Sequence, residues 1–180
     1  MPKKHLIFLP VLIIGCTGIN EHRTTGTFIE DFSIERKVIK SIKKDYDLNE
    51  KSNINANSYN ETLLLTGQVP TEKLRERAVK KAEKIKKVKK IHDYMEIAAP
   101  SSLIARSNDS YLTTKVKTKI LAEALFKKEK NIQADRIKVV TENSTVFLMG
   151  IVSKEQSRVA TKIARETMGV QRVVALWEIL

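Results

Sequence analysis

The sequence predicts an α+β protein made of two tandem α-β-β-α-β units, each with two helices on one face of a three-stranded mixed sheet. A β-rich run that contains a glycine occurs twice, at Leu63–Val69 and Val146–Val152, and each run leads into an amphipathic segment of helical period. Apolar residues also recur every four positions upstream of both runs. A chain of 180 residues has room for two such units of roughly 70 residues each.

The first unit is expected to span residues 31–99. Asp31 and Ser33 are candidate N-caps of its first helix, and Thr71 is the candidate N-cap of its second. In chain order we expect a helix from about 31 to 46, strands at 54–59 and 63–69 joined by a tight turn at Asn60-Glu61, a helix from 72 to about 85, and a strand at 91–97.

The second unit repeats this order over residues 109–180, after a linker at 100–108. Asn108-Asp109-Ser110 is expected to cap its first helix and Ser153 its second, with Gly169 following that helix. The expected elements are a helix from about 111 to 127, strands at 137–141 and 145–152 joined by a turn at Asn143-Ser144, a helix from 154 to about 168, and a strand at 173–179.

The two sheets differ on the face that points away from the helices. Because side chains alternate along a strand, this face is partly polar in the first unit and wholly apolar in the second. The first unit presents Leu64, Thr66, Gln68, His92 and Tyr94, and the second presents Phe147, Met149, Ile151, Val174 and Leu176. A small sheet that is apolar on both faces must be covered twice, so we expect the first domain or a second copy of the chain to pack there.

The first sixteen residues combine a basic start, an apolar run and a small residue before a cysteine, as signal segments do. The apolar run is too short to cross a bilayer as a helix, which takes about 20 residues. Ile13-Ile14-Gly15-Cys16 resembles the lipobox of bacterial lipoproteins, which implies cleavage before Cys16 and its acylation with fatty acids such as palmitate. The alternatives are an ordinary secretory signal and a buried apolar strand. Residues 17–30 are polar and are predicted to form a flexible tether.

No catalytic or metal-binding constellation is visible, so we expect neither an enzyme nor a cofactor beyond the covalent lipid on Cys16. The three histidines are far apart in the sequence, and His92 lies on a strand without the spacing of a metal or general-base site. Gly67 and Gly150 are single glycines that form no phosphate-binding loop. We interpret both glycines as structural, giving room for a close helix-to-strand approach.

The net charge of +12 suits an anionic lipid surface, a nucleic acid or another polyanion. Export and the lack of a recognition motif argue against nucleic acid. On the helix from Tyr111, an aromatic ring lies among Lys115, Lys117 and Lys119, which suits an anionic bilayer, although a solvated basic face remains the alternative. A second basic stripe is interpreted as a solvated helix face or a further polyanion contact: Lys73, Arg77, Lys80, Lys84 and Lys87.

The duplicated glycine strand, its flanking helices and the lipobox resemble the BON family of bacterial envelope domains, most specifically at 108–117 and 146–152. The chain is similar to a two-domain, lipid-anchored member that is not an enzyme. This resemblance implies contact with phosphatidylglycerol or cardiolipin through the helix from Tyr111, where that member has Trp. It also implies a place at the outer membrane, which Thr17 favours, facing the periplasm and enriched at the division site. The alternative function is an adaptor that docks an envelope protein.

Overall fold

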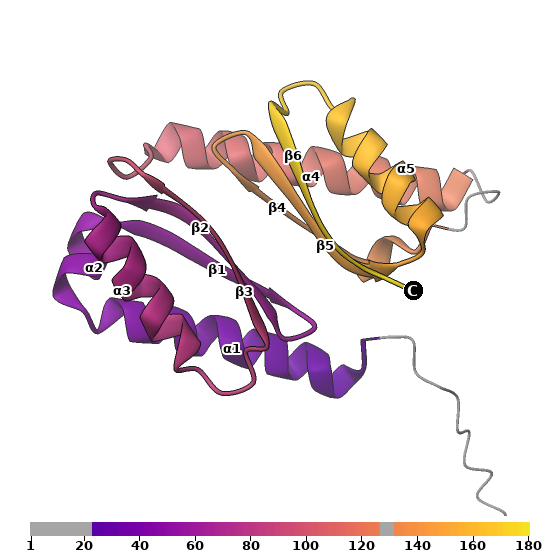
Figure 1. Ribbon diagram of the computed structural model, residues 1–180. Helices are drawn as coiled ribbons and strands as arrows, with labels where there is room; N and C mark the ends of the chain where they lie inside the picture. Colours follow the sequence, from indigo (N-terminus) through magenta and orange to yellow (C-terminus); the bar gives the residue numbers. More distant parts are fainter. Residues whose placement is uncertain (1–22, 127–131) are drawn as a thin grey trace, which may run out of the picture.

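The computed structural model describes residues 23–126 and 132–180 and has the predicted fold class (Figure 1). The predicted signal segment with Cys16, and residues 17–22 of the predicted tether, lie outside the described residues. The first unit consists of α1 (Thr25–Lys43), α2 (Tyr46–Lys51), β1 (Asn53–Tyr59), β2 (Thr62–Val69), α3 (Glu72–Glu83) and β3 (Lys90–Ile97). The second consists of α4 (Leu103–Phe126), the short 3-10 helix η2 (Ala134–Arg136), β4 (Ile137–Glu142), β5 (Thr145–Val152), α5 (Lys154–Arg165) and β6 (Arg172–Ile179).

Both sheets are mixed and share one topology. In each, the first two strands form an antiparallel hairpin and the third strand runs parallel to the middle one. The order is therefore β1-β2-β3 in the first unit and β4-β5-β6 in the second. Thr71 and Ser153 cap α3 and α5 as predicted, and Ser153 forms a full capping box with Gln156.

The predicted N-caps at Asp31 and Asp109 are wrong, because both residues lie inside longer helices. Helix α1 begins at Thr25, where the Thr24 Oγ1 accepts the Thr27 N–H at 3.1 Å. Helix α4 begins at Leu103, where the Ser102 Oγ accepts the Ala105 N–H at 3.2 Å. Residues 25–30 of the predicted tether and 103–108 of the predicted linker are consequently helical.

The two aspartates instead accept hydrogen bonds from the hairpin turns, which lie much later in the sequence. Both turns have two consecutive residues at positive φ, Asn60-Glu61 and Asn143-Ser144, the geometry of a type I′ turn. The Asp109 carboxylate accepts the N–H groups of Asn143 and Ser144 at 2.8 and 2.9 Å. The Asp31 carboxylate accepts those of Asn60 and Glu61, both at 2.8 Å, so each unit locks its hairpin to its first helix.

The prediction that Gly67 and Gly150 admit a close helix-to-strand approach is also wrong, since the backbone atoms nearest to them belong to Asn53 of β1 and to Arg136 just before β4, and neither residue lies in an α-helix. A Cβ on Gly67, whose φ is +111°, would lie 1.9 Å from the Asn53 carbonyl oxygen of the neighbouring strand. A Cβ on Gly150 would lie 2.5 Å from the Arg136 carbonyl oxygen and 3.1 Å from the Trp177 ring. Both glycines therefore permit close backbone pairing at the start of the hairpin.

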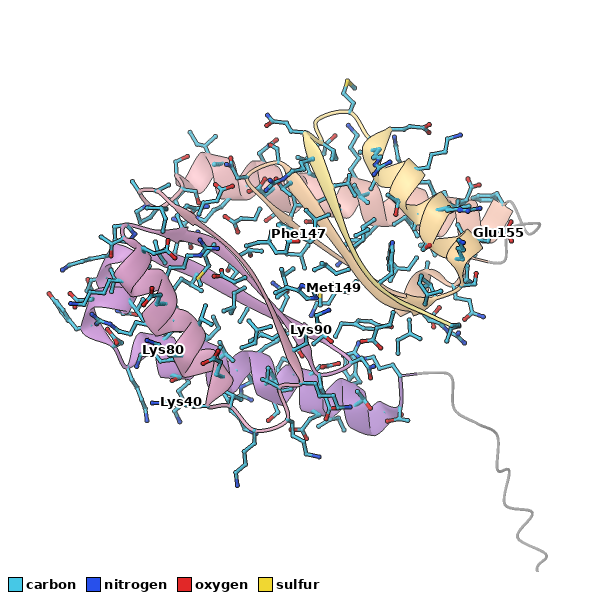
Figure 2. The ribbon with its side chains drawn as sticks, in the orientation of Figure 1. Lys40, Lys80, Lys90, Phe147, Met149 and Glu155 are labelled. Carbon is cyan, nitrogen blue, oxygen red and sulfur yellow. The ribbon has the colours of Figure 1, made fainter. Side chains whose placement is uncertain are left out.

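The helices cover the outer faces of the two sheets, and the inner faces meet, which gives four layers in the order helices, sheet, sheet, helices (Figure 1). Phe147 and Met149 lie between the sheets, where they are almost fully buried (Figure 2). The Tyr94 and Phe147 rings pack edge to face with centroids 5.1 Å apart. The face of the second sheet that we expected to need a cover thus contacts the first domain through one hydrophobic cluster: Tyr59, Leu64, Tyr94, Val140, Phe147, Met149, Ile151, Val174 and Leu176.

Candidate functional site

Helix α4 is apolar on two opposite sides. Its inner side buries Leu112, Val116 and Ile120 against the second sheet. Large apolar side chains are also exposed along its outward side and at its ends, and they have no cover among the described residues: Leu103, Ile104, Tyr111, Leu121, Leu125 and Phe126. The Tyr111 side chain is 61% exposed, so its ring is available to a ligand or a surface. A helix that is apolar outward as well as inward is typical of a binding surface.

Lys115 is the predicted lysine that lies beside the Tyr111 ring. Its ammonium group is 5.6 Å from the ring centroid and donates a hydrogen bond of 3.1 Å to the Met168 carbonyl oxygen. The Met168 side chain, in the turn after α5, is itself largely exposed. Tyr111 and Lys115 therefore form a fixed aromatic and cationic pair on the side of α4 that faces this turn.

Lys117 and Lys119 lie on opposite flanks of α4, two helical positions apart. Lys119 lines a hollow of about 350 Å³ together with Phe126 of α4 and Ile163 of α5. Lys117 lines a different hollow, of about 310 Å³, with Phe28 and Phe32 of α1. The four residues predicted to contact lipid consequently do not form one patch, since Tyr111 and Lys115 are together and the other two lysines border the helix on either side.

The sequence reasoning missed the apolar residues that extend this surface. Leu103 and Ile104 were placed in the linker because the helix was expected to begin near Tyr111. Leu121 and Leu125 follow Tyr111 by ten and fourteen positions, which places them about 80° and about 40° from it around a helix of 3.6 residues per turn. A second apolar period, out of phase with Leu112, Val116 and Ile120, is the signal that could have shown them.

Two members of the basic stripe that begins on α3, Arg77 and Lys80, are paired with acidic side chains. The Arg77 guanidinium lies 3.2 Å from an Asp45 oxygen and 3.4 Å from an Asp47 oxygen, and Lys80 pairs with Glu76 at 4.0 Å. The hydrogen bond from Lys51, and then Arg77, lower the pKa of the Asp47 carboxyl. Arg77 therefore joins α3 to the short helix α2, and less free charge remains on this face than the sequence suggests.

A buried carboxylate joins the two units at their interface. Glu142, 7% exposed, accepts hydrogen bonds from the Gln68 Nε2 at 2.8 Å and the Asn55 Nδ2 at 2.9 Å. Burial raises the pKa of Glu142, and these two hydrogen bonds oppose that rise. Lys138 pairs with Glu35 of α1 across the same interface, so polar contacts fix how the sheets meet.

Among the residues that the structure describes, His92 belongs to no group arranged as a metal site. Burial, and then the charge of Lys90, lower the pKa of its half-buried imidazole. Over residues 23–126 and 132–180, no group of three or more His, Cys, Asp or Glu side chains is arranged to hold a metal ion. Within the same ranges, no helix is both long enough and apolar enough to cross a membrane.

Both units match the family model of the BON domain, at residues 30–99 and 108–179. The chain belongs to the BON-domain family. It is 34% identical over 158 residues to the outer membrane lipoprotein DolP of Haemophilus influenzae, covering 88% of this chain and 79% of that protein. It is also 34% identical over 152 residues to a 21 kDa hemolysin of Actinobacillus pleuropneumoniae, covering 84% of this chain and 75% of that protein.

A further relative is the osmotically-inducible protein Y of Escherichia coli, which is 29% identical over 151 residues, 82% of this chain and 72% of that protein. All three similarities extend across most of the chain, and two BON matches lie in tandem within it. The predicted family and the predicted pair of α-β-β-α-β units are therefore confirmed.

Proposed function

We propose that this protein is a lipid-anchored envelope protein of the outer membrane, facing the periplasm, that contacts anionic phospholipid through α4. The observation that supports lipid contact is the outward side of α4, where Tyr111 and several aliphatic side chains are exposed between flanking lysines. The similarity to the DolP lipoprotein supports the outer membrane and the anchor on Cys16. Binding, with no catalytic step, is the activity proposed.

Two physical effects would act together at this helix. Burying exposed apolar side chains in the boundary between headgroups and acyl chains lowers the free energy, and a tyrosine ring prefers the same depth. Lys119 on one flank and Lys117 on the other border this side of the helix, and their ammonium groups would contact lipid phosphates. Each lysine near an anionic surface contributes about 1 kcal/mol. Phosphatidylglycerol and cardiolipin would therefore be preferred over zwitterionic lipid.

The test is binding of the full chain, made non-acylatable by Cys16→Ser, to vesicles with and without phosphatidylglycerol. Tyr111→Ala is expected to weaken binding to the anionic vesicles by about tenfold, because an interfacial side chain of this size contributes roughly 1.5 kcal/mol or more. Tyr46→Ala on α2 is the matched control, since Tyr46 is also exposed but lies outside α4. Equal binding by both variants would exclude α4 as the lipid contact.

The anchor and the cellular location have separate tests. Metabolic labelling with an alkynyl palmitate is expected to mark the native protein and to fail with Cys16→Ser. A fluorescent fusion would test enrichment at the division site. If the protein docks an envelope partner instead, crosslinking would recover one stoichiometric protein while vesicle binding would be absent.

A further inference from the structure

Helix α1 carries a second exposed apolar group at its amino-terminal end. Phe28, Ile29 and Phe32 are 59%, 63% and 57% exposed, and their spacing places them on adjoining positions of the first two turns. The buried residues of the same helix, from Asp31 to Ile42, lie on the opposite side. Three large exposed apolar side chains in five residues are more than a solvated helix face requires.

Cations follow these apolar side chains along the same helix. A groove of about 970 Å³ on this side is lined by Ile29 and Phe32 and by five basic residues, Arg36, Lys37, Lys40, Lys43 and Lys44. The Arg36 guanidinium lies 5.6 Å from the centroid of the Phe32 ring. Figure 2 shows Lys40 projecting away from the body of the protein.

These five cations are not neutralised within the protein. Among the described residues, none of them forms an ion pair with a carboxylate, whereas Arg77 and Lys80 on α3 do. Glu35, the acidic residue on the groove, is already paired with Lys138 of the second unit. The side of α1 that faces solvent is therefore apolar at its start and positively charged beyond it.

From this arrangement we propose that α1 is a second contact with an anionic phospholipid surface, in addition to α4. The Phe28, Ile29 and Phe32 side chains would enter the headgroup boundary, and the free ammonium groups would contact phosphates. The inference rests on the proposed membrane function, because the anchor predicted at Cys16 keeps this helix near the leaflet. From Cys16 to Thr24 an extended chain reaches at most roughly 30 Å.

Helices α1 and α4 lie in opposite outer layers but border the same edge of the molecule, where one surface could contact both. Lys117 of α4 shares a hollow with Phe28 and Phe32 of α1. Arg106 of α4 shares another with Ile39 of α1, where the edges of the two sheets lie between the helices. An acidic protein could bind the same cations, but it gives no reason for the apolar group to sit at the end of α1 nearest the anchor.

The test compares two triple variants with the same change in charge, both in the full chain carrying Cys16→Ser. Lys40→Gln/Lys43→Gln/Lys44→Gln removes three cations from the end and C-cap of α1, and Lys73→Gln/Lys80→Gln/Lys84→Gln removes three from α3 and its C-cap. With vesicles that contain phosphatidylglycerol, the α1 variant is expected to bind at least about tenfold more weakly than the α3 variant. All six side chains are exposed, so far-UV circular dichroism should show both variants folded.

A second measurement reports α1 independently of affinity. A nitroxide on Ile29→Cys is expected to become more accessible to oxygen and less accessible to a water-soluble relaxant when such vesicles are added, whereas a nitroxide on Tyr46→Cys should not change. Equal binding by the two triple variants, or an unchanged nitroxide at position 29, would overturn the inference whatever Tyr111→Ala does. If Tyr111→Ala weakens binding and the α1 triple variant does not, α4 is the lipid contact and α1 is excluded.

Discussion

The two buried aspartates offer a quantitative test of how each unit is held together. Asp109→Asn keeps the shape of the side chain but replaces one acceptor oxygen with an amide that cannot accept the N–H of Asn143 or Ser144. One hydrogen bond from a backbone N–H to a carboxylate is lost, which costs about 1.5–3 kcal/mol. Asp109 is 6% exposed, so water does not readily replace the lost acceptor.

Asp31→Asn should cost more than Asp109→Asn, because the Asp31 carboxylate has more partners. Besides two turn N–H groups, it accepts the Ser58 Oγ at 2.6 Å and pairs with the Arg23 guanidinium at 2.7 Å. We expect a loss of about 3–5 kcal/mol for this variant. Asp47→Asn is the control, since its ion pairs with Lys51 and Arg77 are exposed to solvent and should contribute little to stability.

Urea unfolding followed by two signals separates the units. Far-UV circular dichroism reports both, and fluorescence of Trp177, the single tryptophan, reports the second unit. Asp109→Asn should lower the fluorescence midpoint, and Asp31→Asn should lower the dichroism midpoint at least as far. If Asp109→Asn behaves like Asp47→Asn, or if Asp31→Asn is the milder of the two buried variants, the account of the turns is wrong.

Two further predictions concern Gly67 and Glu142. Gly67→Ala should lower the free energy of unfolding by about 2 kcal/mol or more, because it combines a positive φ with a clash against the Asn53 carbonyl, whereas Gly26→Ala, which has room for a Cβ, should change it little in thermal melts. Glu142 has a raised pKa in the folded protein, so its ionisation destabilises the fold as pH rises above 4.5, the ordinary value. In urea titrations, Glu142→Gln should therefore become more stable relative to the native chain as the pH rises from about 5 to about 7. If the difference in unfolding free energy between the two chains did not change with pH, the role of burial would be contradicted.

The sequence sufficed wherever a structure is decided by neighbours along the chain. The strand Thr145–Val152 and the caps at Thr71 and Ser153 were predicted correctly, since alternation and capping are local signals. Asp31 and Asp109 were misread for the same reason. An aspartate before an apolar helical period has the local pattern of an N-cap, while its real partners lie about thirty residues further along the chain.

The candidate surface was predictable in part. Tyr111 was correctly expected to be exposed, because three buried positions of α4 fixed the inner side of the helix. The pairing of Arg77 was not predictable, because no helix was expected where α2 lies. Asp45, the N-cap of α2, and Asp47 within it supply the two carboxylates that Arg77 contacts. Free and paired cations look alike in a sequence, and only the fold tells them apart.

The way the two units dock restricts where a partner can bind. The inner faces of both sheets are used against each other, with Glu142 held by Gln68 and Asn55, so neither face is open to a ligand. The outer faces of the sheets are covered by the helices of each unit. What remains is the outward side of the helices, and α3 has much of its charge paired there. Helices α1 and α4, which combine exposed apolar side chains with cations, are therefore where a membrane-binding role is to be sought.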